Sequence, residues 1–234
     1  MDLLGLKLDV LIADEVLGFS SLAIPTAMVA QDSGVLFGHQ VVRDLFGAVP
    51  HASTQWPEKV YVSRSKLDLR DGGLLLESRI EQLMEIEGYF IFHPQEYSMQ
   101  DQADIYRAAK ALVFADGSAF HYYVPFSRKE QKVFVIWRRR MNHLFSWQAK
   151  TFDGPPIQGK PCLNAIYGTE LDRHRQLVGA RGLVDFPALH AQLHSGGFVG
   201  AASWGDAPKT QIEAELGRLT QIKAAPVVDL KVDL

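Results

Sequence analysis

Short apolar segments alternate with amphipathic segments between residues 59 and 126, and this alternation restricts the fold more than any other feature of the chain. Compact apolar runs lie at residues 59–63, 89–92 and 111–115, and each is followed by a segment with helical spacing of its apolar residues. Strands and helices that alternate in this way are typical of a parallel sheet with crossover helices. We therefore predict an α/β fold with a Rossmann-like, mostly parallel sheet flanked by helices.

Turn and cap signals define the predicted helices. The helix over residues 74–87 is followed by Gly88, at the position where a helix-capping glycine belongs. Ser98 and Asp101 form a variant of the capping box and begin a second helix. These signals place the helices between the strands, as crossover connections require.

The chain before residue 58 is less regular. Residues 7–13 predict a buried strand and residues 33–45 a helix, and the segment 50–57 with its two prolines is interpreted as a linker. We therefore divide the chain into an N-terminal α/β portion, residues 1–57, and a Rossmann-like domain, residues 58–234.

The C-terminal part predicts further elements after a proline-rich loop at residues 154–161. These are strands at 163–167 and 176–184, and helices at 188–194 and 211–222. Asp185 has the side chain of an N-cap for the first of these helices. The last residues are predicted to be frayed or to form an edge strand.

Composition excludes some function classes. The chain has 24 basic and 27 acidic residues, so it lacks the basic excess of a general nucleic-acid binder. The one cysteine, Cys162, cannot form an intrachain disulfide and fits a reducing compartment. Residues 16–30, the longest apolar stretch, are too polar to span a bilayer. We expect a cytoplasmic protein; association with the inner face of the membrane and homo-oligomerisation stay open.

The turn after the strand at 111–115 is a candidate phosphate site. Asp116, Gly117, Ser118 and Ala119 join the carboxyl end of a predicted parallel strand to the N-terminus of a helix, where backbone N–H groups attract anions. The alternative is an ordinary glycine turn. Neither a GxGxxG nor a GxxxxGK[ST] motif is present.

Two cations follow the strand at 59–63 and should share this sheet edge. Arg64 and Lys66 could pair with a diphosphate there, or they could be solvated surface cations. His121, one turn into the helix after Gly117, could donate to a phosphate or act as a base, or it could pack among its aromatic neighbours. We interpret the arginines at 138–140 as a solvated strand end.

A metal site is not predicted. His190 and His194 have helical i, i+4 spacing, but Ala191 stands where a metalloprotease has glutamate. No Asp-x-Asp pair is present in the sequence. We expect no cofactor.

Residues 59–126 resemble the domain of glycosyltransferase family 61, which is common in bacterial capsule and exopolysaccharide enzymes. Five pieces match in the family's order: Val60-Tyr61-Val62-Ser63-Arg64 its YISR strand, Glu77 the acid of its NE motif, Gly88-Tyr89 with His93-Pro94 its GF…P, Ser98 to Gln102 with Ala108-Ala109 its next helix, and Gly117-Ser118-Ala119-Phe120-His121 the GSALH form of its HGA motif.

The chain departs from the family pattern at three points. Leu76 precedes Glu77 where many members have Asn, and Asp116 replaces the histidine of the HGA form. Members usually carry a further N-terminal Rossmann-like half that holds the acceptor. Either residues 1–57 are a reduced remnant of it, or this sequence lacks that half.

The resemblance implies the nucleotide-sugar half of a GT-B enzyme. The implied reaction is inverting, metal-independent sugar transfer from a nucleoside diphosphate sugar to a glycan acceptor. The substrate-binding residues would be Arg64, Lys66, Glu77, Gly117, Ser118 and Ala119. Glu77 would bond a ribose hydroxyl or brace Arg64, and the candidate bases are Asp116, His121, Asp14 and Glu15. The alternative is a non-catalytic nucleotide-binding module of a polysaccharide assembly complex. The sugar, the nucleotide base and the acceptor stay open.

Overall fold

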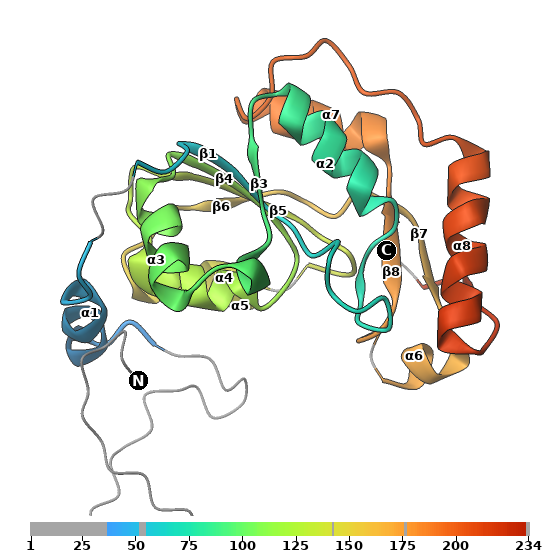
Figure 1. Ribbon diagram of the computed structural model, residues 1–234, viewed down its shortest axis with the longest axis horizontal. Helices are drawn as coiled ribbons and strands as arrows, with labels where there is room; N and C mark the ends of the chain where they lie inside the picture. The colour runs from blue at the N-terminus through green and yellow to red at the C-terminus, as the bar shows by residue number, and fades with distance from the viewer. Residues whose placement is uncertain (1–36, 52–54, 142, 176, 233–234) are drawn as a thin grey trace, which may run out of the picture.

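A computed structural model of the chain describes residues 37–51, 55–141, 143–175 and 177–232. Its centre is a five-stranded sheet in which every pairing is parallel (Figure 1). The strand order is β3 (Phe90–Phe92), β1 (Lys59–Val62), β4 (Ala111–Ala115), β5 (Lys132–Ile136) and β6 (Ile157–Gln158). This confirms the predicted α/β fold with a Rossmann-like parallel sheet.

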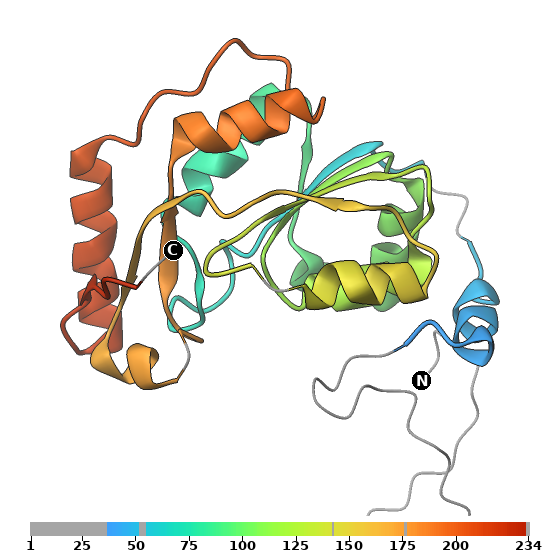
Figure 2. The same ribbon diagram turned by 180° about the vertical axis from the view of Figure 1, so that it is seen from behind.

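Helices cover both faces of this sheet. Seen from either side, α3 (Met99–Ala108), α4 (Ala119–Tyr123) and α5 (Leu144–Thr151) lie on one face, and α2 (Glu77–Ile86) and α7 (Phe186–Ser195) on the other (Figures 1 and 2). The side chains of β1 alternate accordingly: Val60 and Val62 pack with the first group, and Tyr61 packs with the second. The sheet is therefore buried on both faces, as its continuous apolar strands require.

A second, four-stranded sheet stands beside the first. Its order is β2 (Gly73–Leu74), β8 (Arg181–Val184), β7 (Leu163–Gly168) and β9 (Val228–Asp229). Strand β2 lies in sequence between β1 and α2 and pairs parallel with β8, whereas β7 pairs antiparallel with both of its neighbours. The remaining helices are α1 (Gln40–Gly47), α6 (Glu170–His174) and α8 (Lys209–Lys223).

Several predicted boundaries need correction. Helix α2 begins at Glu77 instead of residue 74, because Gly73–Leu74 pairs with β8 and Leu76 has φ +58°. The loop at 154–161 contains the edge strand β6, and the predicted strand at 176–184 is β8, which begins at Arg181 and is joined to β7 through α6. Helix α1 begins at Gln40, and the predicted strand at 7–13 lies outside the described residues.

The predicted caps are present. The Ser98 hydroxyl accepts a hydrogen bond from the Asp101 N–H and donates to the Asp101 carboxylate, while Asp185 accepts from the N–H of Ala188. Gly88 follows α2 with φ +81°, as expected of a C-terminal cap. Within the described residues no helix combines the length and the apolar character needed to cross a membrane.

One buried glutamine ties the end of α3 to the start of β5. The Gln131 amide donates to the carbonyls of Tyr106 and Ala109 at 2.7 and 2.8 Å. It accepts from the Tyr123 hydroxyl at 2.9 Å and from the N–H of Arg128 at 2.8 Å. All four partners would lose their hydrogen bond to this side chain in an apolar variant.

Gln131→Leu should therefore lower the free energy of unfolding by about 3 kcal/mol, because buried donors and acceptors are left unpaired. Chemical denaturation followed by circular dichroism measures this loss. Gln82→Leu, at an exposed position of α2, is the matched control and should stay within about 0.5 kcal/mol of the wild type. Equal stability of the two variants would contradict the assigned role of Gln131.

Candidate functional site

The loops after β1 and β4 meet at the carboxyl edge of the parallel sheet. A Cβ atom on Gly117 would lie 2.3 Å from Nη1 of Arg64, so the guanidinium rests directly against this glycine. The Arg64 Nη2 group donates to the carbonyl of Gly72 at 3.0 Å. The structure thus brings Arg64 and Gly117 together. In an α/β sheet this edge is where ligands usually bind.

Two further arginines join Arg64. Nη1 of Arg138, two residues beyond β5, would lie 2.2 Å from a Cβ atom on Gly72. Arg181 of β8 donates to the carbonyl of Leu74 at 3.1 Å. Both side chains are buried, and burial is the main cause that lowers the pKa of Arg138 to about 10 and also lowers that of Arg181; nearby carboxylates oppose this and nearby arginines add to it.

The interpretation of residues 138–140 as a solvated strand end is therefore wrong for Arg138, which is only 6% exposed. The physical reason is the second sheet. The Nη1 group of Arg138 contacts the carbonyls of Leu177, Val178 and Ala180, which precede β8. Packing against that segment removes the side chain from solvent.

Asp116 supplies counter-charge to this cluster. Its Oδ2 atom lies 3.7 Å from Nε of Arg138 and 3.7 Å from Nε of Arg139, and the residue is 5% exposed. A buried carboxylate between two guanidinium groups offsets part of their repulsion.

The buried guanidinium groups retain unused donors. The Nε groups of Arg64, Arg138 and Arg181 are buried and have no hydrogen-bond partner. Buried N–H donors of a cation normally find an acceptor, because leaving them unpaired costs free energy. The arrangement therefore suits an anion with several acceptor oxygens, such as a phosphate or a carboxylate.

Glu77 supports the backbone that carries Arg64. Its Oε1 atom accepts from the N–H of Arg64 at 2.7 Å, the Ser63 hydroxyl at 3.0 Å and the Tyr61 hydroxyl at 3.3 Å. Burial is the main cause that raises the pKa of Glu77. These contacts hold the backbone at Arg64, and a bond from Glu77 to a ribose hydroxyl stays a prediction.

Lys66 and His121 lie in other surroundings. The Lys66 ammonium forms an exposed ion pair with Glu96 at 2.8 Å, on the β3 side of β1, whereas Arg64 turns toward β4. Nδ1 of His121 lies 2.7 Å from Oε1 of Gln148, and its ring packs edge-on against Phe145. Ser118 precedes α4 without a side-chain cap bond.

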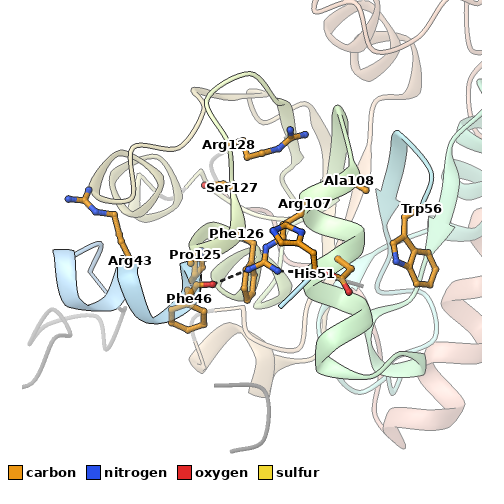
Figure 3. A pocket seen from close by; sticks show the side chains of 12 residues that line it. Arg43, Phe46, His51, Trp56, Arg107, Ala108, Pro125, Phe126, Ser127 and Arg128 are labelled. Carbon is orange, nitrogen blue, oxygen red and sulfur yellow. Dashed lines mark hydrogen bonds and ion pairs between the residues drawn. The ribbon is translucent and has the colours of Figure 1, made fainter. Parts of the chain in front are cut away.

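A basic cavity of about 380 Å³ lies at the opposite, amino end of the strands (Figure 3). Arg107 donates there to the carbonyls of Phe46 and Pro50 and lies over the Phe126 ring, while Arg43 pairs with Asp153. These arginines fasten α1 and the segment after it to the domain. Both arginines already bind partners within the chain, so this cavity is a weaker candidate for an anion site than the cluster around Arg64.

Among residues 37–51, 55–141, 143–175 and 177–232, no three His, Cys, Asp or Glu side chains gather in a way that could hold a metal ion. The nearest sequence candidate, His190, instead contacts the carbonyl of Ala201 through Nε2 at 2.8 Å.

Comparison with known proteins identifies the family. A family model described as Glycosyltransferase 61 matches residues 12–134, just over half of the chain. The match includes Arg64, Glu77 and Gly117 and ends before Arg138 and Arg181. No curated protein matches the chain. Because the family model covers more than half of its residues, the protein belongs to the glycosyltransferase 61 family.

Proposed function

We propose that this protein transfers a sugar from a nucleoside diphosphate sugar to a glycan acceptor, with inversion and without an obligatory metal, in capsule or exopolysaccharide biosynthesis. Membership of the family indicates glycosyltransferase activity, and hence a donor and an acceptor. The observation that carries the donor assignment is the cluster of the half-buried Arg64 with the buried Arg138 and Arg181 at the sheet edge, whose Nε groups have no hydrogen-bond partner.

The oxygens of a diphosphate match the guanidinium donors of this cluster. They accept from guanidinium groups in pairs, and the negative charge that develops on the leaving diphosphate is neutralised by fixed cations. Arg64 is the central donor, and the backbone of Gly117, Ser118 and Ala119 lies beside it. Lys66 would join only by leaving Glu96, an exposed partner that costs little to lose.

Of the two candidate bases that lie in the described residues, Asp116 and His121, we favour His121. The Nδ1 group faces an amide oxygen and therefore donates its proton to Gln148, which leaves the lone pair of Nε2 to accept the proton of the acceptor hydroxyl. Asp116 is engaged with Arg138 and Arg139, so we assign it to positioning these guanidinium groups. The other candidates, Asp14 and Glu15, lie outside the described residues.

The remaining expectations extend this proposal. We propose that residues 58–234 are the nucleotide-sugar half of a GT-B enzyme and that residues 1–57 are a remnant of the acceptor half. We place the protein in the cytoplasm. We extend the proposal to association with the inner face of the membrane and to formation of a homo-oligomer.

Arg64→Ala should weaken nucleotide binding enough to abolish the thermal shift, because it removes the central phosphate donor. UDP, GDP and CMP are tested by thermal shift, and one nucleotide at 100 times its Kd should stabilise the wild type by about 2.7 kcal/mol. Affinity should fall more than about tenfold in the variant. Arg70→Ala, which removes an exposed ion pair with Asp68, is the control and should bind normally.

Two outcomes would contradict the donor assignment. One is the absence of stabilisation of the wild type by every nucleotide. The other is an unchanged shift in Arg64→Ala.

His121→Gln should retain nucleotide binding and lower the rate of sugar transfer by about 10²–10⁴-fold, the usual contribution of a general base. Donor hydrolysis and transfer are measured with the nucleotide sugar whose nucleotide binds. A rate equal to that of the wild type would remove His121 from the reaction. Binding without hydrolysis or transfer in the wild type would favour the non-catalytic module.

Asp116→Asn should lower the free energy of unfolding by about 3 kcal/mol, because Arg138 is left buried beside other cations. Asp153→Asn breaks the partly exposed pair with Arg43 and should cost no more than about 1 kcal/mol. Urea denaturation compares the two. Equal losses would contradict the counter-charge role of Asp116.

A further inference from the structure

A second polar cluster, formed by Ser63, Ser65, Glu77 and Glu81, adjoins Arg64. The Ser63 hydroxyl is 2.6 Å from Oε1 of Glu81 and 3.0 Å from Oε1 of Glu77, and the Ser65 hydroxyl is also 2.6 Å from Oε1 of Glu81. The two glutamates are four residues apart on α2 and face the loop that follows β1. Ser63 and Ser65 flank Arg64 in sequence, so this cluster holds both neighbours of the arginine.

The hydrogen atoms of this cluster can be counted. A serine hydroxyl donates one proton and accepts two. The Ser63 oxygen already accepts from the N–H of Ser65 at 3.0 Å and has short contacts with two carboxyl oxygens. Its single proton forms a full hydrogen bond with only one of them. A proton on the carboxyl side would complete the other contact, and both Glu77 and Glu81 reach Ser63 to hold it.

The surroundings support a retained proton. Glu77 faces Tyr61 of β1, Arg64 after β1, Glu81 of its own helix and Arg181 of β8; Glu81 also faces His93 at the end of β3, beyond which lie Lys66 and Glu96. Burial and the Glu81 charge raise the pKa of Glu77, whereas the Arg64 N–H, the Ser63 hydroxyl and Arg181 oppose this.

His93 does not replace the shared proton. Its Nε2 atom lies 3.6 Å from Oε1 of Glu81, which is too long for a hydrogen bond. Burial is the main cause that lowers the pKa of His93, so its imidazole is neutral near pH 7. A proton between Glu77 and Glu81 would therefore be held by the two carboxyls and not by the imidazole.

We infer that Glu81 is a positioning residue, which shares one proton with Glu77 across the Ser63 hydroxyl and thereby fixes Arg64 for the donor diphosphate. This inference rests on the proposed function. When the proton is lost, two carboxylates face one hydroxyl proton, and their repulsion loosens the segment from Ser63 to Ser65. The donor then binds more weakly because Arg64 is no longer held against Gly117.

The direction of the pH effect follows from the linkage. An acid whose pKa is raised in the folded protein contributes stability that is present at low pH and is lost as the pH rises through the raised value. An ordinary glutamate is fully ionised above about pH 6. Nucleotide affinity should therefore fall as the pH rises above the range in which exposed glutamates titrate.

The test uses the full chain and the nucleotide that stabilises it among UDP, GDP and CMP. Calorimetric titration from about pH 6 to pH 9 should show an affinity that falls about tenfold in the wild type. In Glu81→Gln the amide can donate to both serine hydroxyls without a shared proton, so its affinity should be nearly constant. Glu85→Gln, at an exposed position one turn along α2, should keep the wild-type profile.

Infrared spectroscopy of the unliganded protein gives a readout that does not depend on nucleotide. The wild type at about pH 7 should show the C=O band of a protonated carboxyl group, and Glu81→Gln should lack it. Absence of the band in the wild type would overturn the inference. So would equal pH profiles of the wild type and Glu81→Gln.

The same measurements separate this inference from the proposed function. If the band is present and no nucleotide binds at any pH, the proposed donor fails, and the role of Glu81 in donor binding fails with it. If a nucleotide binds and the band is absent, the donor assignment stands and the shared proton does not exist.

Discussion

Burial of several guanidinium groups at one edge of the parallel sheet is the constraint on which the rest of the site depends. Arg138 and Arg181 are nearly inaccessible to solvent, and each is destabilised by its cationic neighbours. Such an arrangement persists only if opposite charge and backbone acceptors surround it. Asp116 supplies the charge, and the carbonyls that precede β8 supply acceptors.

The second sheet supplies part of the surroundings that these arginines need. Strand β2, inserted between β1 and α2, pairs with β8 and so brings Gly72 and Arg181 to the edge of the first sheet. The insertion leaves Leu76 with φ +58°, a conformation that a branched side chain rarely adopts. The left-handed residue allows the chain to turn from β2 directly into α2. Glu77 thereby reaches the backbone of Arg64.

The sequence predicts the alternating region well, because local signals decide it. Strands at 59–63 and 111–115, the cap at Ser98 and the joint position of Arg64 and Gly117 all follow from periodicity and the parallel-sheet rule. Non-local contacts explain the failures. The sequence near Arg138 does not indicate that a segment about forty residues later covers its side chain. Its place after a parallel strand does put it on the same sheet edge as Arg64 and Gly117. Likewise, Gly73–Leu74 is a strand only because β8 lies beside it.

The departure from the family motif at position 116 is explained by the same cluster. The related motif has histidine where this chain has Asp116, and a histidine there could not supply the negative charge that Asp116 places beside Arg138 and Arg139. A carboxylate instead allows an arginine to be buried at position 138, outside the segment that the family model matches. We therefore interpret Asp116 and Arg138 as a coupled pair. Under the proposed function, this pair holds a guanidinium group at the edge where the donor phosphates would bind, and Asp116 is engaged by arginines instead of accepting a proton. The proposal then assigns proton removal to His121, which the same turn supplies and which lies against Gln148.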